Sequence, residues 1–387
     1  MQVLFAYSLK NLMARRGTTA FAAGGIALVV LVFVSVLMLG EGFRRTLVST
    51  GSPDNAIVLR SGATSELVSA IARDLAPIIK TQPEVATDSD GRPVAAAEMI
   101  FIININRRGT RSPSNVVVRG VEPESVQMRP VRIIEGRMWR PGLSEVIAGK
   151  LISEKFEGCR VGERVHMGGR DWDVVGVFDA GGTAFESEIW GDSEQTMAAI
   201  RRGSYSSVTV RLRDPNGVGS LRERLAADPR FNVQVKSEKT FYVEQSRNLL
   251  LFIYILGIFV TVVFSLAAIL AAMLTMFATI GARTAEIGTL RALGFSRASI
   301  LLAFVAESVL LGLMGGVAGV VPGFALRQIS FSTTNFASFS EVAWKLSFTP
   351  AIALTGLLFA ATMGFLGGLI PAVRASRIPI VDSLREA

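Results

Sequence analysis

The stretch that decides the fold is RTAEIGTLRALGFSR, residues 283–297, a short polar segment enclosed by two long apolar runs. The residues before it, 248–282, contain no charged side chain, and the residues after it, 298–326, contain only Glu307. A run of about 20 apolar residues is long enough to cross a bilayer as a helix. The pattern therefore predicts a short polar helix that joins two membrane helices on one side of a membrane.

Four such apolar runs occur in the chain, where 50% of the 387 residues are hydrophobic. The uncharged run at residues 17–40 is longer than the roughly 7–15 apolar residues of a signal-peptide core, so we expect a retained membrane helix. The run at 248–282 would be roughly 50 Å long, against a hydrocarbon core of about 30 Å, so its excess should protrude as a stalk. We expect an α-helical membrane protein with four transmembrane helices and an α+β extracytoplasmic domain inserted between helices 1 and 2.

We expect nine segments along the chain. They are an amphipathic N-terminal helix (1–17), transmembrane helix 1 (18–40), the α+β domain (41–246), the stalk and transmembrane helix 2 (247–282), the polar helix (283–297), transmembrane helix 3 (298–326), an outer loop (327–345), transmembrane helix 4 (346–371) and a C-terminal tail (372–387).

The charges orient these segments. Residues 1–18, 281–299 and 371–387 hold nine basic and three acidic residues, whereas residues 41–247 hold 29 basic and 27 acidic ones. Basic residues gather at the cytoplasmic ends of membrane helices. Both termini and the polar helix are therefore expected in the cytoplasm, and the domain 41–246 on the outside. Most of the net charge of +8 comes from basic residues that flank the membrane helices, so no nucleic-acid partner is expected.

The inserted domain alternates strand-like and helical patterns. Strands are expected at 56–60, 99–105, 115–121, 206–212 and 231–237, and helices at 65–79 and 219–228. Residues 143–156 begin as a strand and become a helix, and residues 164–180 form a hairpin around Gly168 and Gly169. The mixture predicts an α+β domain in two lobes, with residues of about 125–200 as the inserted lobe.

The residues needed for catalysis are missing. EVIAGK (145–150) is similar to the end of a phosphate-binding loop, but Ser144 stands where the first glycine is needed, and Leu151 follows the lysine. His166 is the only histidine and Cys159 the only cysteine, which excludes a His-based metal site, a Ser-His-Asp triad and an internal disulfide. We therefore expect no catalytic residue, cofactor or metal on this chain.

Small residues mark two of the membrane helices. The pattern G-x-x-x-G occurs in four pairs: Gly312–Gly316, Gly315–Gly319, Gly319–Gly323 and Gly364–Gly368. Such spacing lets helix backbones approach closely, either within the chain or between chains. Glu307 is costly in lipid, so it should face protein or reach the interface.

The polar helix carries its own end signals. Gly294 is suited to cap its C-terminus, and Ser296 can cap the start of the next membrane helix. Ile287, Leu290 and Leu293 offer an apolar stripe. A helix this short is unstable alone in water, so it must rest on the membrane interface or on a cytoplasmic partner.

The segment RTAEIGTLRALGFSRASILLAFVAESVLLGLMGGVAGVVPG resembles the permease subunits of the FtsX-like and MacB-like ABC transporters, the mechanotransmission group. The pattern R-x-x-E-I-G-x-x-R-A-x-G falls on Arg283, Glu286, Ile287, Gly288, Arg291, Ala292 and Gly294, with Glu307 and Gly315-Gly316 following. The C-terminus is also similar, at Pro371, Ala372, Arg374, Ala375, Ser376, Pro379, Leu384 and Arg385. The likeness is specific at 283–323 and 367–385 and weaker over 41–246.

The resemblance implies a bacterial inner-membrane permease, a homodimer in lipid, that works with two copies of a separate cytoplasmic ATPase. ATP and Mg would bind that partner, and this chain would not be an enzyme. Residues 283–297 would be the coupling helix, with Arg283, Glu286, Ile287, Leu290, Arg291, Leu293 and Gly294 as its coupling residues. MacB itself has a fused ATPase domain in front; here about 18 residues precede the first span, so the ATPase is expected on another chain.

The family leaves three functions open for this chain. Export with a periplasmic adaptor and an outer-membrane duct is favoured over extraction of a lipoprotein or lipid, and over FtsX-like regulation of a periplasmic enzyme without transport. A membrane-anchored sensor or receptor is the alternative from another class. It is disfavoured because the expected cytoplasmic segments are too short for a signalling domain.

Overall fold

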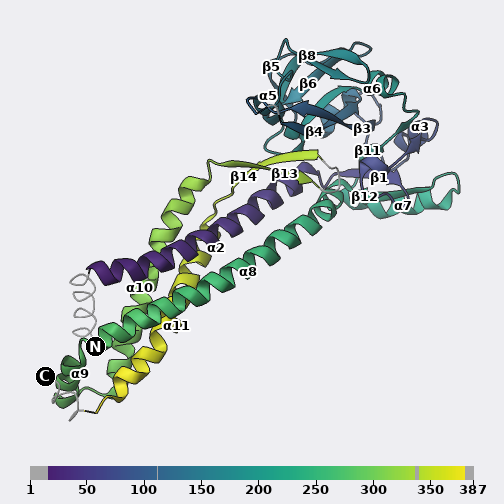
Figure 1. Ribbon diagram of the computed structural model, residues 1–387. Helices are drawn as coiled ribbons and strands as arrows, with labels where there is room; N and C mark the ends of the chain where they lie inside the picture. Colours follow the sequence, from purple (N-terminus) through teal and green to yellow (C-terminus); the bar gives the residue numbers. More distant parts are fainter. Residues whose placement is uncertain (1–15, 111, 336–339, 380–387) are drawn as a thin grey trace. The chain divides into compact units, whose positions relative to one another are not determined.

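The computed structural model describes residues 16–110, 112–335 and 340–379, and the chain divides into two compact units (Figure 1). The helical unit comprises the residues up to Glu41, residues 252–329 and the residues from Lys345 onward. The α/β unit comprises residues 42–251 and 330–344. Most of the N-terminal helix expected over 1–17, and residues 380–387 of the expected tail, lie outside the described residues.

Among the described residues, four helices are long and apolar enough to cross a membrane. They are α2 (Arg16–Thr50), α8 (Glu238–Gly281), α10 (Arg297–Leu326) and α11 (Pro350–Arg377). α8 has 44 residues and is therefore about 66 Å long at 1.5 Å per residue, longer than a bilayer requires. It begins at Glu238, before the expected boundary at 247, and α11 continues past 371 to Arg377.

The glycines of α10 divide between two neighbouring helices. A Cβ at Gly319 would lie 2.5 Å from the carbonyl oxygen of Ala27 on α2. A Cβ at Gly312 would lie 2.5 Å from the carbonyl oxygen of Ala360 on α11. The other glycines expected in helix packing also meet a neighbouring helix: Gly315, Gly316, Gly323, Gly364 and Gly368. The structure therefore places these close approaches within one chain, with α10 between α2 and α11.

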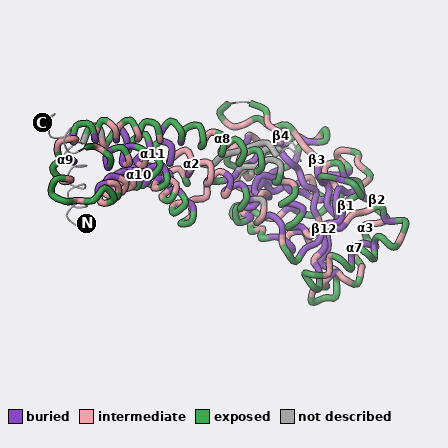
Figure 2. Tube along the Cα trace, turned by 90° about the horizontal axis from the view of Figure 1, so that it is seen from below, coloured by how far each residue is buried: buried purple, intermediate pink, exposed green. Residues whose placement is uncertain are grey.

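Of the four long helices, α8 has the smallest buried share of residues in its most apolar stretch. A stripe of small side chains is turned inward: Gly257, Thr261, Ser265, Ala268 and Ala272. Its other faces expose large apolar side chains such as Phe252, Ile255 and Phe259, and much of α8 is green in Figure 2. Such surfaces are stable in lipid or against another apolar helix.

The α/β unit is built on one ten-stranded mixed sheet in the order β12-β1-β11-β3-β4-β9-β6-β8-β5, with β7 paired to β8. The strands are β1 (Asn55–Arg60), β3 (Ala95–Asn106), β4 (Pro113–Val121), β5 (Arg132–Gly136), β6 (Glu145–Gly149), β7 (Arg164–Met167), β8 (Arg170–Asp179), β9 (Glu188–Asp192), β11 (Ser207–Arg211) and β12 (Val233–Ser237). The helices are α3 (Leu75–Lys80), α4 (Pro123–Met128), α5 (Lys150–Lys155), α6 (Ser193–Ile200) and α7 (Val218–Ala227).

Strand β3 joins the two halves of this sheet. Its first residues pair with β11, with Ala97 opposite Val208, and its remaining residues pair with β4, with Phe101 opposite Val118. The second half of the sheet thus includes β4 and the later part of β3. The lobe expected at about 125–200 therefore begins earlier in the chain, and the two halves share a strand.

Most expected elements occur in the structure, and the hairpin at 164–180 turns where Gly168 and Gly169 both have positive φ. The prediction of one helix over 65–79 is wrong. That segment holds a 3-10 turn (Glu66–Val68), the short strand β2 (Ile71–Ala72), which pairs with β10 (Ser204–Tyr205), and α3. The outer loop expected at 327–345 contains a strand pair, β13 (Ser330–Asn335) and β14 (Ser340–Lys345).

Candidate functional site

The polar segment forms helix α9 (Thr284–Ala292) in the helical unit, and both of its end signals are used. Gly294 has φ of +95°; its N–H donates to Arg291 O, and Phe295 N–H donates to Leu290 O. These two bonds form a Schellman motif, which satisfies carbonyls that the helix end leaves free. Ser296 Oγ then accepts the N–H of Ser299 at 3.1 Å and caps α10. α9 is therefore a defined helix with fixed ends.

One face of α9 is built into the helical unit. Ile287 is buried, and so is Gly288 beside it. Ile287 packs in an apolar cluster whose other buried members come from α8, α10 and α11: Met276, Ile280, Ile300, Phe304, Ala372 and Ala375. This burial provides the support that so short a helix needs.

Arg283 links α9 to α10 through Glu307. The buried Arg283 guanidinium donates from Nη1 to Glu307 Oε2 at 3.3 Å and from Nε to Glu286 Oε2 at 2.9 Å. It also lies 5.4 Å from the centre of the Phe304 ring. Glu307 is buried as well, so the ion pair compensates two charges that would each be costly without a partner. The sequence left two positions open for Glu307, against protein or at the membrane interface, and the structure shows the first, with Arg283 as its partner.

Arg291 links α9 to α11. Its Nη1 donates to the carbonyl oxygen of Ser376 at 2.9 Å. Ser376 lies in the last turn of α11, where a helix leaves carbonyl oxygens without partners in the helix. A guanidinium at this position satisfies such an oxygen and is favoured by the helix dipole. Arg283 and Arg291 thus hold α9 to two different membrane helices.

The opposite face of α9 is open. Glu286 and Thr289 are exposed, and Leu293, just after the helix, is 73% exposed. These three residues follow the spacing of one helical face. The expected apolar stripe of Ile287, Leu290 and Leu293 is therefore not one surface: Ile287 points inward, Leu290 is half-buried and Leu293 points outward.

The structure also locates Cys159 and His166, for which no catalytic or metal-binding role was expected. Cys159 is buried, and burial raises the pKa of its thiol to about 12. His166 lies on the surface with its Nδ1 2.8 Å from Asp171 Oδ1. Within the part of the chain that the structure describes, no group of three His, Cys, Asp or Glu side chains is placed to hold a metal ion.

The chain matches two family models. Residues 19–228, more than half of the chain, match the MacB-like periplasmic core domain, and residues 258–380 match the FtsX-like permease C-terminal domain. The second match includes α9, α10 and α11.

Similar curated proteins are known from several bacteria. The uncharacterized ABC transporter permease YknZ of Bacillus subtilis (strain 168) is 21% identical, over 98% of this chain and 97% of that protein. The macrolide export ATP-binding/permease protein MacB of Bdellovibrio bacteriovorus is 26% identical, over 97% of this chain but 60% of that protein. The chain thus spans about three fifths of its MacB relatives.

Among solved structures, the extracellular domain of the noncanonic ABC-type transporter YknZ from Gram-positive bacteria is similar at 17% identity. Its TM-score is 0.36, and the match covers 47% of this chain and 99% of that one. Because one family model covers more than half of the sequence and a second covers the membrane helices that follow, the chain belongs to the FtsX-like and MacB-like permeases of ABC transporters.

Proposed function

We propose that this permease couples ATP hydrolysis by a separate cytoplasmic ATPase to motion of its α/β unit in the periplasm. The observation that carries the proposal is the two-sided construction of α9. One side is fixed to α10 and α11 by Arg283 and Arg291, and the other side presents Glu286, Thr289 and Leu293. An exposed leucine on a short, well-supported helix is suited to bury against a protein partner.

The contacts around α9 define how force would pass into the membrane. A partner that displaces the open face moves α9 as a whole, because Ile287 and Arg283 leave it little freedom to tilt by itself. α10 would follow through Glu307, and α11 through Ser376. Both termini and α9 would then lie in the cytoplasm of a bacterium, with the α/β unit outside its inner membrane, as the basic ends of the spans favour.

The proposed assembly contains two copies of this permease and two ATPase subunits, with ATP and Mg bound by the ATPases. YknZ and the related permease YvrN of Bacillus subtilis support a separate ATPase, because this chain covers 97% of each of them. Several MacB relatives are named for macrolide export. Export together with a periplasmic adaptor and an outer-membrane duct is therefore the favoured activity, and lipoprotein or lipid extraction or regulation of a periplasmic enzyme are the alternatives.

Co-purification tests this proposal. The permease is expressed with the products of its neighbouring genes and isolated in mild detergent, and any ATP hydrolysis that it stimulates is measured. We expect a stoichiometric ATPase with the wild-type chain and about tenfold weaker association for Leu293→Asp, because a buried charge replaces an apolar contact. The control is Leu143→Asp, which alters an exposed leucine of the α/β unit. A wild-type chain without any ATPase, or equal effects of both variants, would contradict the proposal.

A further inference from the structure

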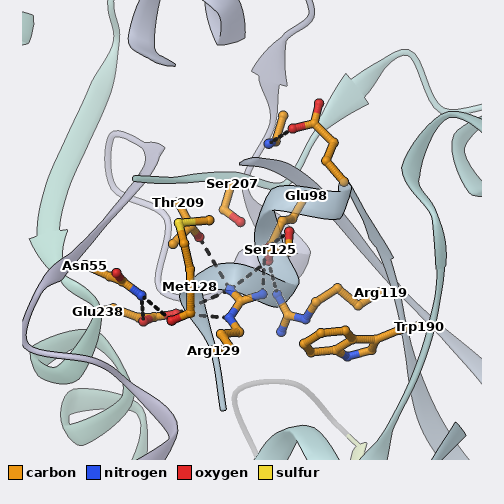
Figure 3. Close-up of polar contacts among 12 residues, drawn as sticks. Asn55, Glu98, Arg119, Ser125, Met128, Arg129, Trp190, Ser207, Thr209 and Glu238 are labelled. Atoms are coloured by element: carbon orange, nitrogen blue, oxygen red, sulfur yellow. Dashed lines mark hydrogen bonds and ion pairs between the residues drawn. The ribbon is translucent and has the colours of Figure 1, made fainter. Parts of the chain in front are cut away.

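The α/β unit contains a buried cluster of charges that is separate from the ion pairs of α9 (Figure 3). At its centre are the guanidinium groups of Arg119 on β4 and Arg129, which follows α4. Four buried carboxylates surround them, those of Glu66, Glu98, Glu188 and Glu238. Each carboxylate comes from a different element: the 3-10 turn, β3, β9 and the first turn of α8.

Arg119 binds three of these carboxylates. It holds Glu188 with Nε at 2.7 Å and Nη2 at 2.9 Å, Glu66 with Nη1 at 2.9 Å and Glu98 with Nη1 at 2.8 Å. The indole N–H of Trp190 donates to Glu188 at 2.7 Å. This half of the cluster joins strands β3, β4 and β9 side to side.

Arg129 joins this sheet to the long helix. Its Nη2 donates to Glu98 Oε2 at 2.9 Å and to Glu238 Oε1 at 3.3 Å. Glu98 lies in the shared strand β3, and Glu238 is the first residue of α8. The Arg129 guanidinium also lies 4.5 Å from the centre of the Phe185 ring, within the range of a cation–π attraction. One side chain thus bridges the start of α8 and the middle of the sheet.

Glu238 has further partners in the residues that follow α2. Its Oε2 accepts the N–H of Ser52 at 3.1 Å and the side-chain amide of Asn55 at 2.8 Å. A Cβ at Gly51 would lie 2.6 Å from the backbone of Glu238, so only glycine fits there. The end of α2 is held as well, because Thr50 Oγ1 accepts the N–H of Ala184 at 2.8 Å.

The carboxylates outnumber the guanidinium groups, and neutral donors complete the cluster. Ser125 Oγ donates to Glu98 at 2.8 Å, and Ser207 Oγ donates to Glu66 at 2.8 Å. Together with the Trp190 and Asn55 bonds, every carboxylate of the cluster accepts hydrogen bonds from more than one group. A buried network in which every charge is paired holds one geometry, because any displacement leaves a charge without a partner in a poorly solvated interior.

We propose that Arg129, by bridging Glu98 and Glu238, forms a rigid joint that fixes the first turns of α8 to the central strands of the α/β unit. The role of this joint in force transmission rests on the proposed function. In that function, a displacement of α8 would move the sheet directly, with no hinge at residues 238–242. Phe241 and Tyr242, both buried in the apolar core beside Trp190, extend the same joint by one turn. Arg129 is therefore a positioning residue for force transmission.

Hydrogen–deuterium exchange on the full chain in lipid nanodiscs tests the joint. In Arg129→Lys the charge is kept, but a single ammonium cannot hold both carboxylates in the planar geometry of a guanidinium. We expect exchange at residues 241–245, whose N–H groups make the first hydrogen bonds of α8, to rise about tenfold or more, since charge-assisted bonds are lost. The control is Arg224→Lys, which makes the same substitution at an exposed arginine that pairs with Glu84 alone. Glu238→Ala, with Glu244→Ala as its exposed control, provides a second route if the lysine variant does not fold.

This first arm uses no ATPase and no nucleotide, so it stands even where the proposed function fails. Unchanged exchange at 241–245 in both Arg129→Lys and Glu238→Ala would overturn the joint. A second arm compares the wild-type complex with its ATPase before and after trapping with ATP and vanadate. We expect residues 241–245 to stay equally protected in both states, and a rise in their exchange on trapping would show a hinge in place of a rigid joint.

Discussion

Close packing of α10 within the chain predicts opposite effects for the same substitution at two glycines. In Gly319→Ala the new methyl group would lie 2.5 Å from the carbonyl oxygen of Ala27 and 2.9 Å from Val30 Cβ. In Gly24→Ala, on α2, the new methyl group meets no atom within 4 Å. Both variants gain about 1 kcal/mol of intrinsic helix propensity. Only Gly319→Ala must also separate two helices, and overpacking costs about 1–3 kcal/mol.

We therefore expect Gly24→Ala to be up to about 1 kcal/mol more stable than the wild type and Gly319→Ala to be up to about 2 kcal/mol less stable. The difference between the two free energies of unfolding is about 1–3 kcal/mol. The assay is unfolding of the purified chain in mixed micelles with increasing SDS, followed by circular dichroism. Equal midpoints for the two variants would refute the packing argument. A difference that depends on protein concentration would instead place the contact of Gly319 between chains.

Three further predictions follow from the ion pairs and the cap. Glu307→Gln should lower stability in the same SDS assay by about 1–3 kcal/mol, because Arg283 loses a charged partner; an unchanged midpoint would argue against the pair. Gly294→Val should cost about 1–2 kcal/mol, since valine resists φ of +95°, and should speed amide exchange across α9 alone; uniform exchange throughout the chain would not fit. Burial raises the pKa of Glu98, but the attraction of Arg129 and Arg119 outweighs this effect and leaves the pKa below its ordinary 4.5. The stability that the ionised carboxylate contributes is therefore present above pH 4.5 and is lost as the pH falls through the lowered pKa. Glu98→Gln should therefore be about 3–5 kcal/mol less stable at pH 7 but less sensitive to acid below pH 4.5, as thermal unfolding at several pH values would show; an unaltered acid dependence would contradict this.

The apolar runs and end signals predicted the helical unit closely because they depend on neighbouring residues. The cap at Gly294 and the N-cap at Ser296 need no knowledge of the rest of the chain. Which glycine faces which helix was not predictable, since the three G-x-x-x-G pairs on α10 look alike in sequence. The pairing of Arg283 with Glu307 likewise requires the path of the chain, because 24 residues separate them.

The α/β unit shows a different limit. The segment 65–79 has the apolar period of a helix, yet Ile71 pairs with Tyr205, so a tertiary contact prevails over the local pattern. Strand β9 was not expected, because its five residues carry no alternation and include Gly191. The charge cluster was also missed: its residues are spread from Glu66 to Glu238, and no short motif connects them.

The close contact between Gly51 and Glu238 affects which segments of such a chain could be replaced during evolution or design. Ser52, at the entrance of the insertion, donates its N–H to Glu238, at the exit, across 3.1 Å. An insertion whose two ends touch occupies a single point on its host, and such points tolerate exchange of the inserted part. Residues 52–237 are therefore a cassette. Another domain grafted in their place needs ends that meet at the same spacing and side chains that replace the contacts of Phe241 and Tyr242 with the core of the α/β unit.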